Sequence, residues 1–311
     1  MPGQSTPLSR KGDIRYRDVM RYLDPKVLSK ISNLELLARL VVEGFLVGLH
    51  KSPYHGFSVE FSAYRQYMQG DDLKFVDWKI WGRTDELYVK LFTEETNLRS
   101  YILLDTSASM GYGDGVTKYQ YGIYLAAAMS YLMLMQKDAV GVATFDTEIH
   151  NITPPKSRWD HLFHILKILD SLKVGKRTKF SSCLHMLAER FRKRGLVVVI
   201  SDFFDDREEI VQALKHFRYY GHEVIMFQVF TPDEVELPFP GQIMFEDLET
   251  TERLLTIPSA IQADYKKNFS EHQRLLKRDC QNNLIDFVTV TTKDSLGIAL
   301  AEYLAKRKRA M

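Results

Sequence analysis

The stretch that decides the fold is RSYILLDTSAS, residues 99–109. Residues 101–104 form a continuous apolar run, which is typical of a strand buried on both faces in a parallel sheet. Asp105 follows this run directly, so we expect it at the carboxyl end of a core strand, where open α/β sheets bind ligands. Ser107 and Ser109 add two hydroxyl groups to the same loop. The stretch therefore predicts both a sheet and a group of oxygen ligands at its edge.

Downstream, apolar runs alternate with amphipathic stretches. This alternation predicts an α/β fold with a doubly wound, mostly parallel central sheet and helices on both faces. The expected strands are AVGVATF, LVVVISD, EVIMFQVF and FVTVTT, and the expected helices cover about 118–137, 159–172, 180–192, 207–219, 259–278 and a last segment ending at Lys306. Residues 231–251 contain three prolines and interrupt the alternation; the flanking runs IMFEDL and RLLTI predict a hairpin at the sheet edge.

The region upstream differs in pattern. Apolar residues recur at spacings of three and four over residues 25–50, which predicts a helix. Residues 56–90 contain short aromatic and β-branched runs broken by glycines, which predict short strands and turns. We therefore expect a flexible N-terminus over 1–20, a helix and a β-rich region over 21–98 packed on the main domain, and the main α/β domain over 99–311.

Composition excludes several classes of function. A formal net charge of +2 gives no general attraction for nucleic acid, and the basic tail at residues 306–309 is typical of a helix C-terminus. The most apolar helical stretch, residues 34–49, is short and interrupted by charges, so no membrane span is expected. The N-terminus lacks a secretory core, and Cys183 and Cys280 are far apart, which favours a reducing, cytoplasmic setting.

Polar residues also follow other expected strands. Asp202 ends the run LVVVIS as Asp105 ends YILL, and Thr178 lies in a polar loop just before a helix. Because neighbouring parallel strands present their carboxyl ends at one edge, we expect these loops to converge. A hard cation such as Mg²⁺ takes about six oxygen ligands, more than one loop provides. The alternative is that residues 105–109 only cap the following helix.

This pattern resembles the metal-ion-dependent adhesion site of von Willebrand factor A domains, in which Asp-x-Ser-x-Ser, a loop threonine and a later Ser-Asp form the site. The resemblance implies one divalent ion, Mg²⁺ or alternatively Mn²⁺ or Ca²⁺, with a coordination position open to a partner's carboxylate. In many relatives the threonine follows two glycines, whereas residues 175–178 read GKRT here, and Ser181 is the alternative ligand. The implied ligands are Asp105, Ser107, Ser109, Thr178 and Asp202.

A second resemblance lies upstream, in residues 55–95. It rests on YR at 64–65, GDD at 70–72, DWK at 77–79, RT at 83–84 and LYVK at 87–90. The block is similar to the signature of the domain of unknown function 58 family, and the combined resemblance covers about residues 20–300. It implies a partner of a MoxR-type AAA+ ATPase that helps to remodel or mature other protein complexes. The charged residues of the block favour a salt-bridged layer, with partner binding as the alternative.

The leading hypothesis is thus a non-enzymatic, metal-dependent protein-binding module. The alternative is a Mg²⁺-dependent phosphatase of the haloacid dehalogenase type, which also has an aspartate after its first strand. That chemistry normally requires a second aspartate two residues later, where this chain has Ser107. No phosphate loop or dinucleotide-binding glycine motif is present, and His161 and His164 fit a helix surface better than a metal site. A scaffold without metal is the third possibility.

Overall fold

The computed structural model describes residues 24–30, 32–51, 64–68, 81–83, 86–90, 98–175, 180–248 and 252–310. The main body is a six-stranded sheet in the order β10-β7-β6-β3-β4-β5. All neighbouring pairs are parallel except β4 and β5. The strands are β3 (Arg99–Asp105), β4 (Ala139–Phe145), β5 (Ile149–Ile152), β6 (Leu196–Ser201), β7 (Glu223–Phe230) and β10 (Ile285–Thr291). The predicted fold class is confirmed.

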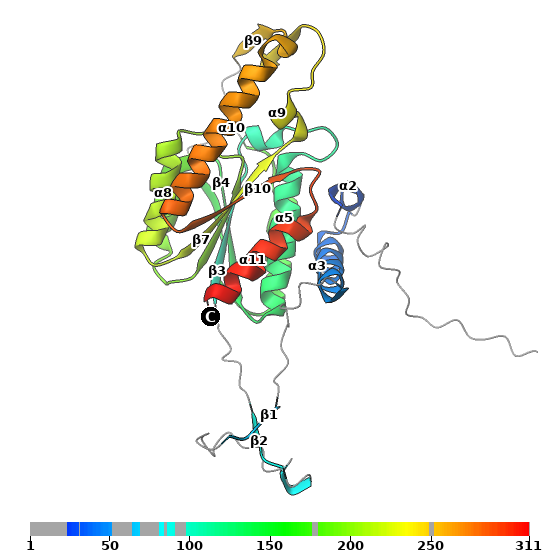
Figure 1. Ribbon diagram of the computed structural model, residues 1–311, viewed down its shortest axis with the longest axis vertical. Helices are drawn as coiled ribbons and strands as arrows, with labels where there is room; N and C mark the ends of the chain where they lie inside the picture. Colours follow the sequence, from blue (N-terminus) through cyan, green and yellow to red (C-terminus); the bar gives the residue numbers. More distant parts are fainter. Residues whose placement is uncertain are drawn as a thin grey trace, which may run out of the picture.

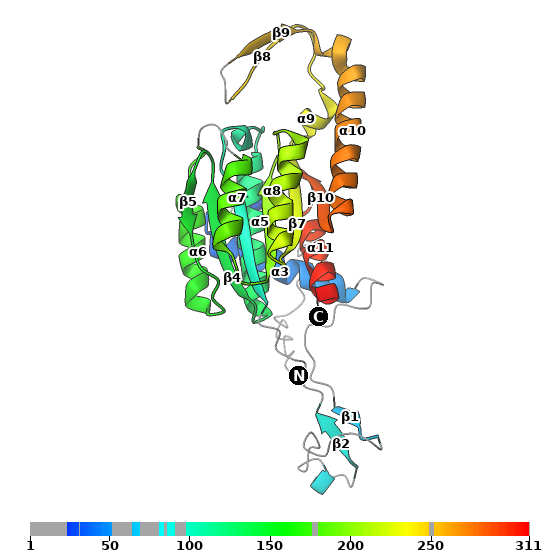
Figure 2. The ribbon, with the colours of Figure 1, turned by 90° about the vertical axis from the view of Figure 1, so that its left-hand side faces the viewer.

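Helices cover both faces of this sheet (Figures 1 and 2). Alternate residues of the strands divide the core into two parts, because successive side chains of a strand point to opposite faces. Ile102 and Leu104 of β3 pack with α3, α5, α6 and α11, whereas Leu103 packs with α7, α8 and α10. These helices are α3 (Leu34–Lys51), α5 (Lys118–Met135), α6 (Trp159–Ser171), α7 (Phe180–Arg190), α8 (Arg207–Tyr219), α10 (Pro258–Asn282) and α11 (Leu296–Ala310).

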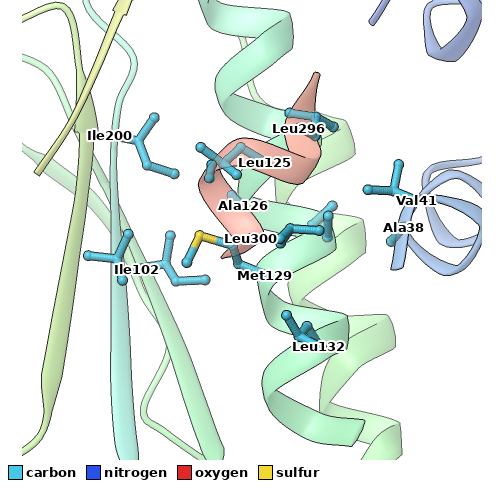
Figure 3. Packing of buried hydrophobic residues seen from close by; sticks show 14 of the residues in the cluster. Ala38, Val41, Ile102, Leu125, Ala126, Met129, Leu132, Ile200, Leu296 and Leu300 are labelled. Carbon is cyan, nitrogen blue, oxygen red and sulfur yellow. The ribbon is translucent and has the colours of Figure 1, made fainter. Parts of the chain in front are cut away.

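Helix α5 lies at the centre of the first helical layer. Figure 3 shows Met129 and Leu125 between Ile102 of the sheet and Val41 of α3. The helix is therefore covered on several sides, and its apolar residues are not confined to one stripe. Because α5 is enclosed in this way, the position of its first residue, Lys118, is fixed relative to the sheet.

The N-terminal part departs from the prediction of one helix over residues 25–50. Helix α2 (Pro25–Leu28) ends early and α3 begins at Leu34, so the segment is broken. Asn33 accounts for the new start, because its Oδ1 accepts a hydrogen bond of 3.0 Å from the Leu36 amide. The predicted short strands of residues 56–90 include an antiparallel pair, β1 (Tyr64–Gln66) and β2 (Tyr88–Lys90). Most of this signature block lies outside the described residues, and its packing on the main domain stays a prediction.

The last part of the fold is an arm that extends beyond the sheet (Figure 2). It consists of α9 (Pro232–Glu236), the antiparallel strands β8 (Ile243–Glu246) and β9 (Arg253–Thr256), and the outer half of α10. The predicted hairpin is present, but it forms its own sheet and does not extend the edge of the main one. Because α10 has 25 residues and is about 37 Å long, it can hold the hairpin above the carboxyl ends of the strands.

Within the described residues, three elements were not predicted from the sequence: the 3₁₀ helix η2 (Ser109–Gly111), the edge strand β5 and helix α9. All three are short, and short elements give too few residues for a period to be recognised. Among the helices in the described part of the chain, none is long and apolar enough to serve as a membrane span.

Candidate metal centre

The candidate site lies where the winding of the sheet reverses. From β3 the chain adds β4 and β5 on one side, and then returns to place β6, β7 and β10 on the other. The carboxyl ends of β3 and β6 therefore flank the switch point, which is the usual ligand-binding position in open α/β sheets. Asp105 ends β3 and Ser201 ends β6, with Asp202 immediately after it.

Asp105 is almost completely buried, with a relative exposure of 1%. Its Oδ1 accepts a hydrogen bond of 2.9 Å from the Ser107 amide, and its Oδ2 accepts one of 2.6 Å from the Ser201 hydroxyl. Burial, and after it the charge of Asp202, raise the pKa of Asp105 to about 7, although these hydrogen bonds act to lower it. The carboxyl groups of Asp105 and Asp202 are thus buried close together, where burial and mutual repulsion both disfavour the negatively charged form of Asp105.

The loop after Asp105 brings hydroxyl groups to the same place. Ser107 is fully buried, Ser109 is half-buried, and their Oγ atoms lie 3.1 Å apart. The loop is held from below because both the amide and the hydroxyl of Thr106 donate to the Phe145 carbonyl, at 2.8 and 3.0 Å. The backbone of β4 therefore fixes the loop that carries these hydroxyls.

Asp202 is placed by a tight turn at the end of β6. Phe203 has a φ of +54°, an unusual conformation for a large side chain. Its amide donates a hydrogen bond of 2.9 Å to the Ser201 hydroxyl. The side chain of Gln228, from β7, donates one of 3.0 Å to the carbonyl of Asp202. Ser201 thus joins the turn that carries Asp202 to the carboxylate of Asp105.

Lys118 is the residue that sequence reasoning missed. Its side chain is 1% exposed, and its Nζ donates to Asp202 Oδ2 at 2.7 Å and to Glu234 Oε1 at 2.5 Å. Lys118 begins α5, where the helix dipole disfavours a cation. That mismatch is a sequence signal, since a lysine there requires nearby carboxylates. Their source, Asp202 and the unpredicted α9, could not be read from the spacing.

Glu234 connects the site to the arm. Its Oε2 accepts hydrogen bonds of 2.7 and 3.1 Å from the amide and hydroxyl of Thr231, which cap the N-terminus of α9. Its Oε1 binds Lys118. One carboxylate therefore links the cap of α9 to the buried lysine beside Asp202.

The structure brings together most of the sequence-predicted ligands. Asp105, Ser107 and Asp202 are buried at the switch point, and Ser109 joins them through its hydroxyl. Thr178 lies outside the described residues, so its position is not part of this geometry. The alternative ligand Ser181 is in the first turn of α7, and its buried hydroxyl contacts no hydrogen-bonding partner within the described residues.

The donor set fits a hard cation. It contains two carboxylates and two hydroxyls, the oxygen ligands that Mg²⁺ and Ca²⁺ prefer. No group of three or more His, Cys, Asp or Glu side chains suited to a metal occurs in the described part of the chain. A cation here would consequently depend on serine oxygens and water in addition to the aspartates. Lys118 already shares Asp202, so Asp105 is the carboxylate best placed to bind a metal directly.

Comparison with known proteins gives a family match over most of the chain. A family model described as protein of unknown function DUF58 matches residues 63–275. The uncharacterized protein Rv1480 of Mycobacterium tuberculosis is 24% identical over 293 residues, covering 92% of this chain and 91% of that protein. The uncharacterized protein MAV169 of Mycobacterium avium is 27% identical over 139 residues, covering 44% of this chain and 80% of that protein.

Solved structures are similar at low sequence identity. BatB from Bacteroides thetaiotaomicron is 17% identical, with a TM-score of 0.46, and the match covers 68% of this chain and 99% of that chain. The SpRpn10 VWA domain is 14% identical, with a TM-score of 0.39, and the match covers 66% of this chain and 94% of that chain.

Proposed function

The chain belongs to the DUF58 family, and we propose that its α/β domain is a non-enzymatic protein-binding module that uses Mg²⁺ at the sheet switch point. The observation that supports this most is the burial of Asp105 beside Asp202, with the hydroxyls of Ser107 and Ser109 at hand. Two buried carboxylates repel each other unless a cation lies between them or a proton is bound. A divalent ion would relieve this repulsion.

An acidic residue of a partner is the ligand we propose for this ion. The proposed ligand set contains two carboxylates, and Lys118 already neutralises part of the charge of Asp202. A bound Mg²⁺ would therefore be incompletely neutralised and would attract a further carboxylate. Ser109 is the half-buried member of the set, so an incoming group would reach the site from its side.

The phosphatase alternative gains no support from the geometry. Its acid and base would be a carboxyl group two residues after Asp105. Ser107 occupies that position, and its hydroxyl lies against Ser109. Asp105 could act as a nucleophile, but Ser107 stands where a phosphatase needs a carboxyl group as general acid and base. This favours binding over hydrolysis.

The proposed collaborator is a MoxR-type AAA+ ATPase, acting with this chain on a client protein in the cytoplasm. The DUF58 resemblance suggests this ATPase, and the absence of a phosphate loop in the sequence leaves hydrolysis to the partner. The two cysteines are buried and are not joined in a disulfide, which is compatible with a reducing compartment.

Metal titration tests the first part of the proposal. Calorimetry with Mg²⁺ and Mn²⁺ should give one site in the wild type, and Asp105→Ala should weaken binding by more than about 100-fold. Asp138→Asn is the matched control, because Asp138 is also fully buried but lies at the start of β4, at the other end of the sheet. Equal binding by wild type and Asp105→Ala would refute the site.

Partner capture tests the second part. The tagged chain is incubated with a MoxR-type ATPase from the same organism, and separately with cell extract analysed by mass spectrometry. Chelator and Asp105→Ala should each remove the captured proteins, while Asp138→Asn should retain them. Circular dichroism verifies that every variant is folded. Retention of the same proteins by Asp105→Ala would place recognition elsewhere on the surface.

A further inference from the structure

A groove of about 610 Å³ adjoins the candidate metal centre. Ser109 and Lys118 line it on the side of the sheet, and Phe245 and Leu254 line it on the side of the β8–β9 hairpin. Figure 2 shows the hairpin held above this edge of the sheet by α10. We propose that the groove binds a segment of a partner protein that carries a bulky apolar side chain beside a lysine or arginine.

The apolar part of the proposal rests on side chains exposed in the groove. Phe204 is 53% exposed, Leu254 is 63% exposed and Ile261 is 39% exposed, although each comes from a different element. Single exposed apolar residues are common on protein surfaces, but several that converge on one hollow indicate a binding site. The volume lies within the range of about 300 to 1,000 Å³ that is usual for ligand sites.

The hairpin presents one of its two faces to the groove. Phe245 and Leu254 are directly opposite each other in the β8–β9 register, and both line the groove. Met244 and Leu255 form the next pair and, by the alternation of strands, point to the other face. An isolated two-stranded hairpin is only marginally stable in water, so a partner packed on the Phe245 face would also stabilise the hairpin.

The charge of the groove selects the partner. Lys118 is the cation among the lining residues that the structure describes, and it already binds Asp202 and Glu234. Glu246 pairs with Arg253, but both side chains are largely exposed, and such pairs contribute little. The described lining residues therefore carry a net negative charge, which attracts a basic segment and repels an acidic one. Its acidic lining residues are Asp233, Glu234, Glu246 and Asp247.

The same charge argues against other occupants. A symmetric contact between two copies would place one acidic groove against another, since both copies use the same surface. Anionic lipid and nucleic acid would be repelled for the same reason. The neighbouring metal site, as proposed above, attracts a carboxylate, so the two sites favour opposite charges and can be tested separately.

The experiment uses a library of short random peptides displayed on phage, selected against the full-length chain in the presence of chelator. The enriched peptides should contain an aromatic or large aliphatic residue near a lysine or arginine. The most enriched peptide is then synthesised with a fluorescent label, and its affinity is measured by anisotropy. Enrichment without a basic preference would overturn the proposal.

Matched variants locate the binding surface. Leu254→Glu should weaken binding by about tenfold or more, whereas Leu255→Glu, on the other face of the same strand, should leave it unchanged. The double variant Asp233→Lys with Asp247→Lys should reverse the preference toward acidic peptides. Equal effects of Leu254→Glu and Leu255→Glu would place the contact outside the groove.

Two further experiments distinguish peptide binding in the groove from metal binding and from self-association. Asp105→Ala should keep the peptide affinity, and Leu254→Glu should keep the Mg²⁺ affinity, so either site can fail without the other. Sedimentation of the wild type over a range of concentrations should show a monomer. Self-association that is lost in Leu254→Glu would overturn the proposal and make a second copy the occupant.

Discussion

The two ends of the central sheet bury polar groups in different ways. At the amino end, Asp138 accepts a hydrogen bond of 3.0 Å from the hydroxyl of Tyr303 on α11. The ring of buried His222 bonds to the Phe191 carbonyl. At the carboxyl end, Asp105 lies beside a second carboxylate and a buried lysine. In these contacts the amino end joins polar groups to neutral partners, whereas the carboxyl end concentrates charge.

This difference shows what a buried aspartate indicates. Asp138 and Asp105 are both buried, and each lies at one end of a core strand, so burial alone does not mark a site. A neutral partner such as Tyr303 fixes one element against another. Like charges kept together in the interior are unfavourable to stability, and such groups are concentrated at functional sites.

The largest effect on stability should come from removing Lys118, the buried cation at the carboxyl end of the sheet. Lys118→Met leaves Asp202 and Glu234 without their counter-ion, and breaking a buried pair in this way costs about 3 to 5 kcal/mol of unfolding free energy. Urea unfolding without metal measures it. Lys266→Met is the control, because the Lys266–Glu236 pair is exposed and should contribute less than about 1 kcal/mol. Similar losses in both variants would contradict the importance of the buried network.

A smaller loss of stability is expected from removing the Ser201 hydroxyl, which binds Asp105 at the carboxyl end of the sheet. Ser201→Ala removes the donor to Asp105 and the acceptor for the Phe203 amide, and it should lower the unfolding free energy by about 2 kcal/mol. Ser171→Ala, on an exposed helix end, provides the comparison. Because the loss includes a partner of Asp105, Mg²⁺ affinity should change as well. A stability loss with unchanged Mg²⁺ affinity would separate Ser201 from the site.

At the amino end a comparable deletion should affect stability alone. Tyr303→Phe removes the hydroxyl that binds Asp138 and should lower the unfolding free energy by about 1 kcal/mol. Calorimetric Mg²⁺ binding should match that of the wild type. A change in metal affinity would mean that the two ends of the sheet are coupled.

The smallest effect concerns the pH dependence of the amino end. Burial lowers the pKa of His222 below 6.5, so the folded chain resists the proton that the unfolded chain accepts. Stability from this residue is complete above pH 6.5 and declines as the pH falls below it. His222→Gln keeps a donor for Phe191 and should flatten this part of the curve of unfolding free energy against pH. An unchanged slope would assign the effect to other histidines.

Much of the fold could be predicted because the main elements carry strong patterns. Helix α8 begins at Arg207 and ends at Tyr219, as predicted, since its apolar stripe is clear and Asp206 caps it. The break before α3 was missed because the apolar spacing continues through residues 29–33 and only the cap of Asn33 interrupts it. Strand β5 has four residues, too few for alternation to identify it.

Only the site residues that lie at the end of a predicted strand could be placed from the sequence. Asp105 and Asp202 could be placed at one edge because parallel strands end together. Lys118 could not, because its role depends on Glu234, which is 116 positions away in the chain and is brought beside it only by the tertiary fold. Pairing between distant side chains is set by tertiary geometry, which periodicity does not contain.

The strand order has a consequence for how the protein is made. Strand β3 is central, but its neighbour β6 begins almost a hundred residues later along the chain. While the ribosome has delivered only β3, β4 and β5, one edge of β3 has no partner and Asp105 lacks the hydroxyl of Ser201. Contacts this distant in sequence form slowly, and unpaired strand edges are prone to aggregation. The switch point is consequently completed only after β6 has been synthesised, and until then the open edge of β3 is exposed to the solvent or to other chains.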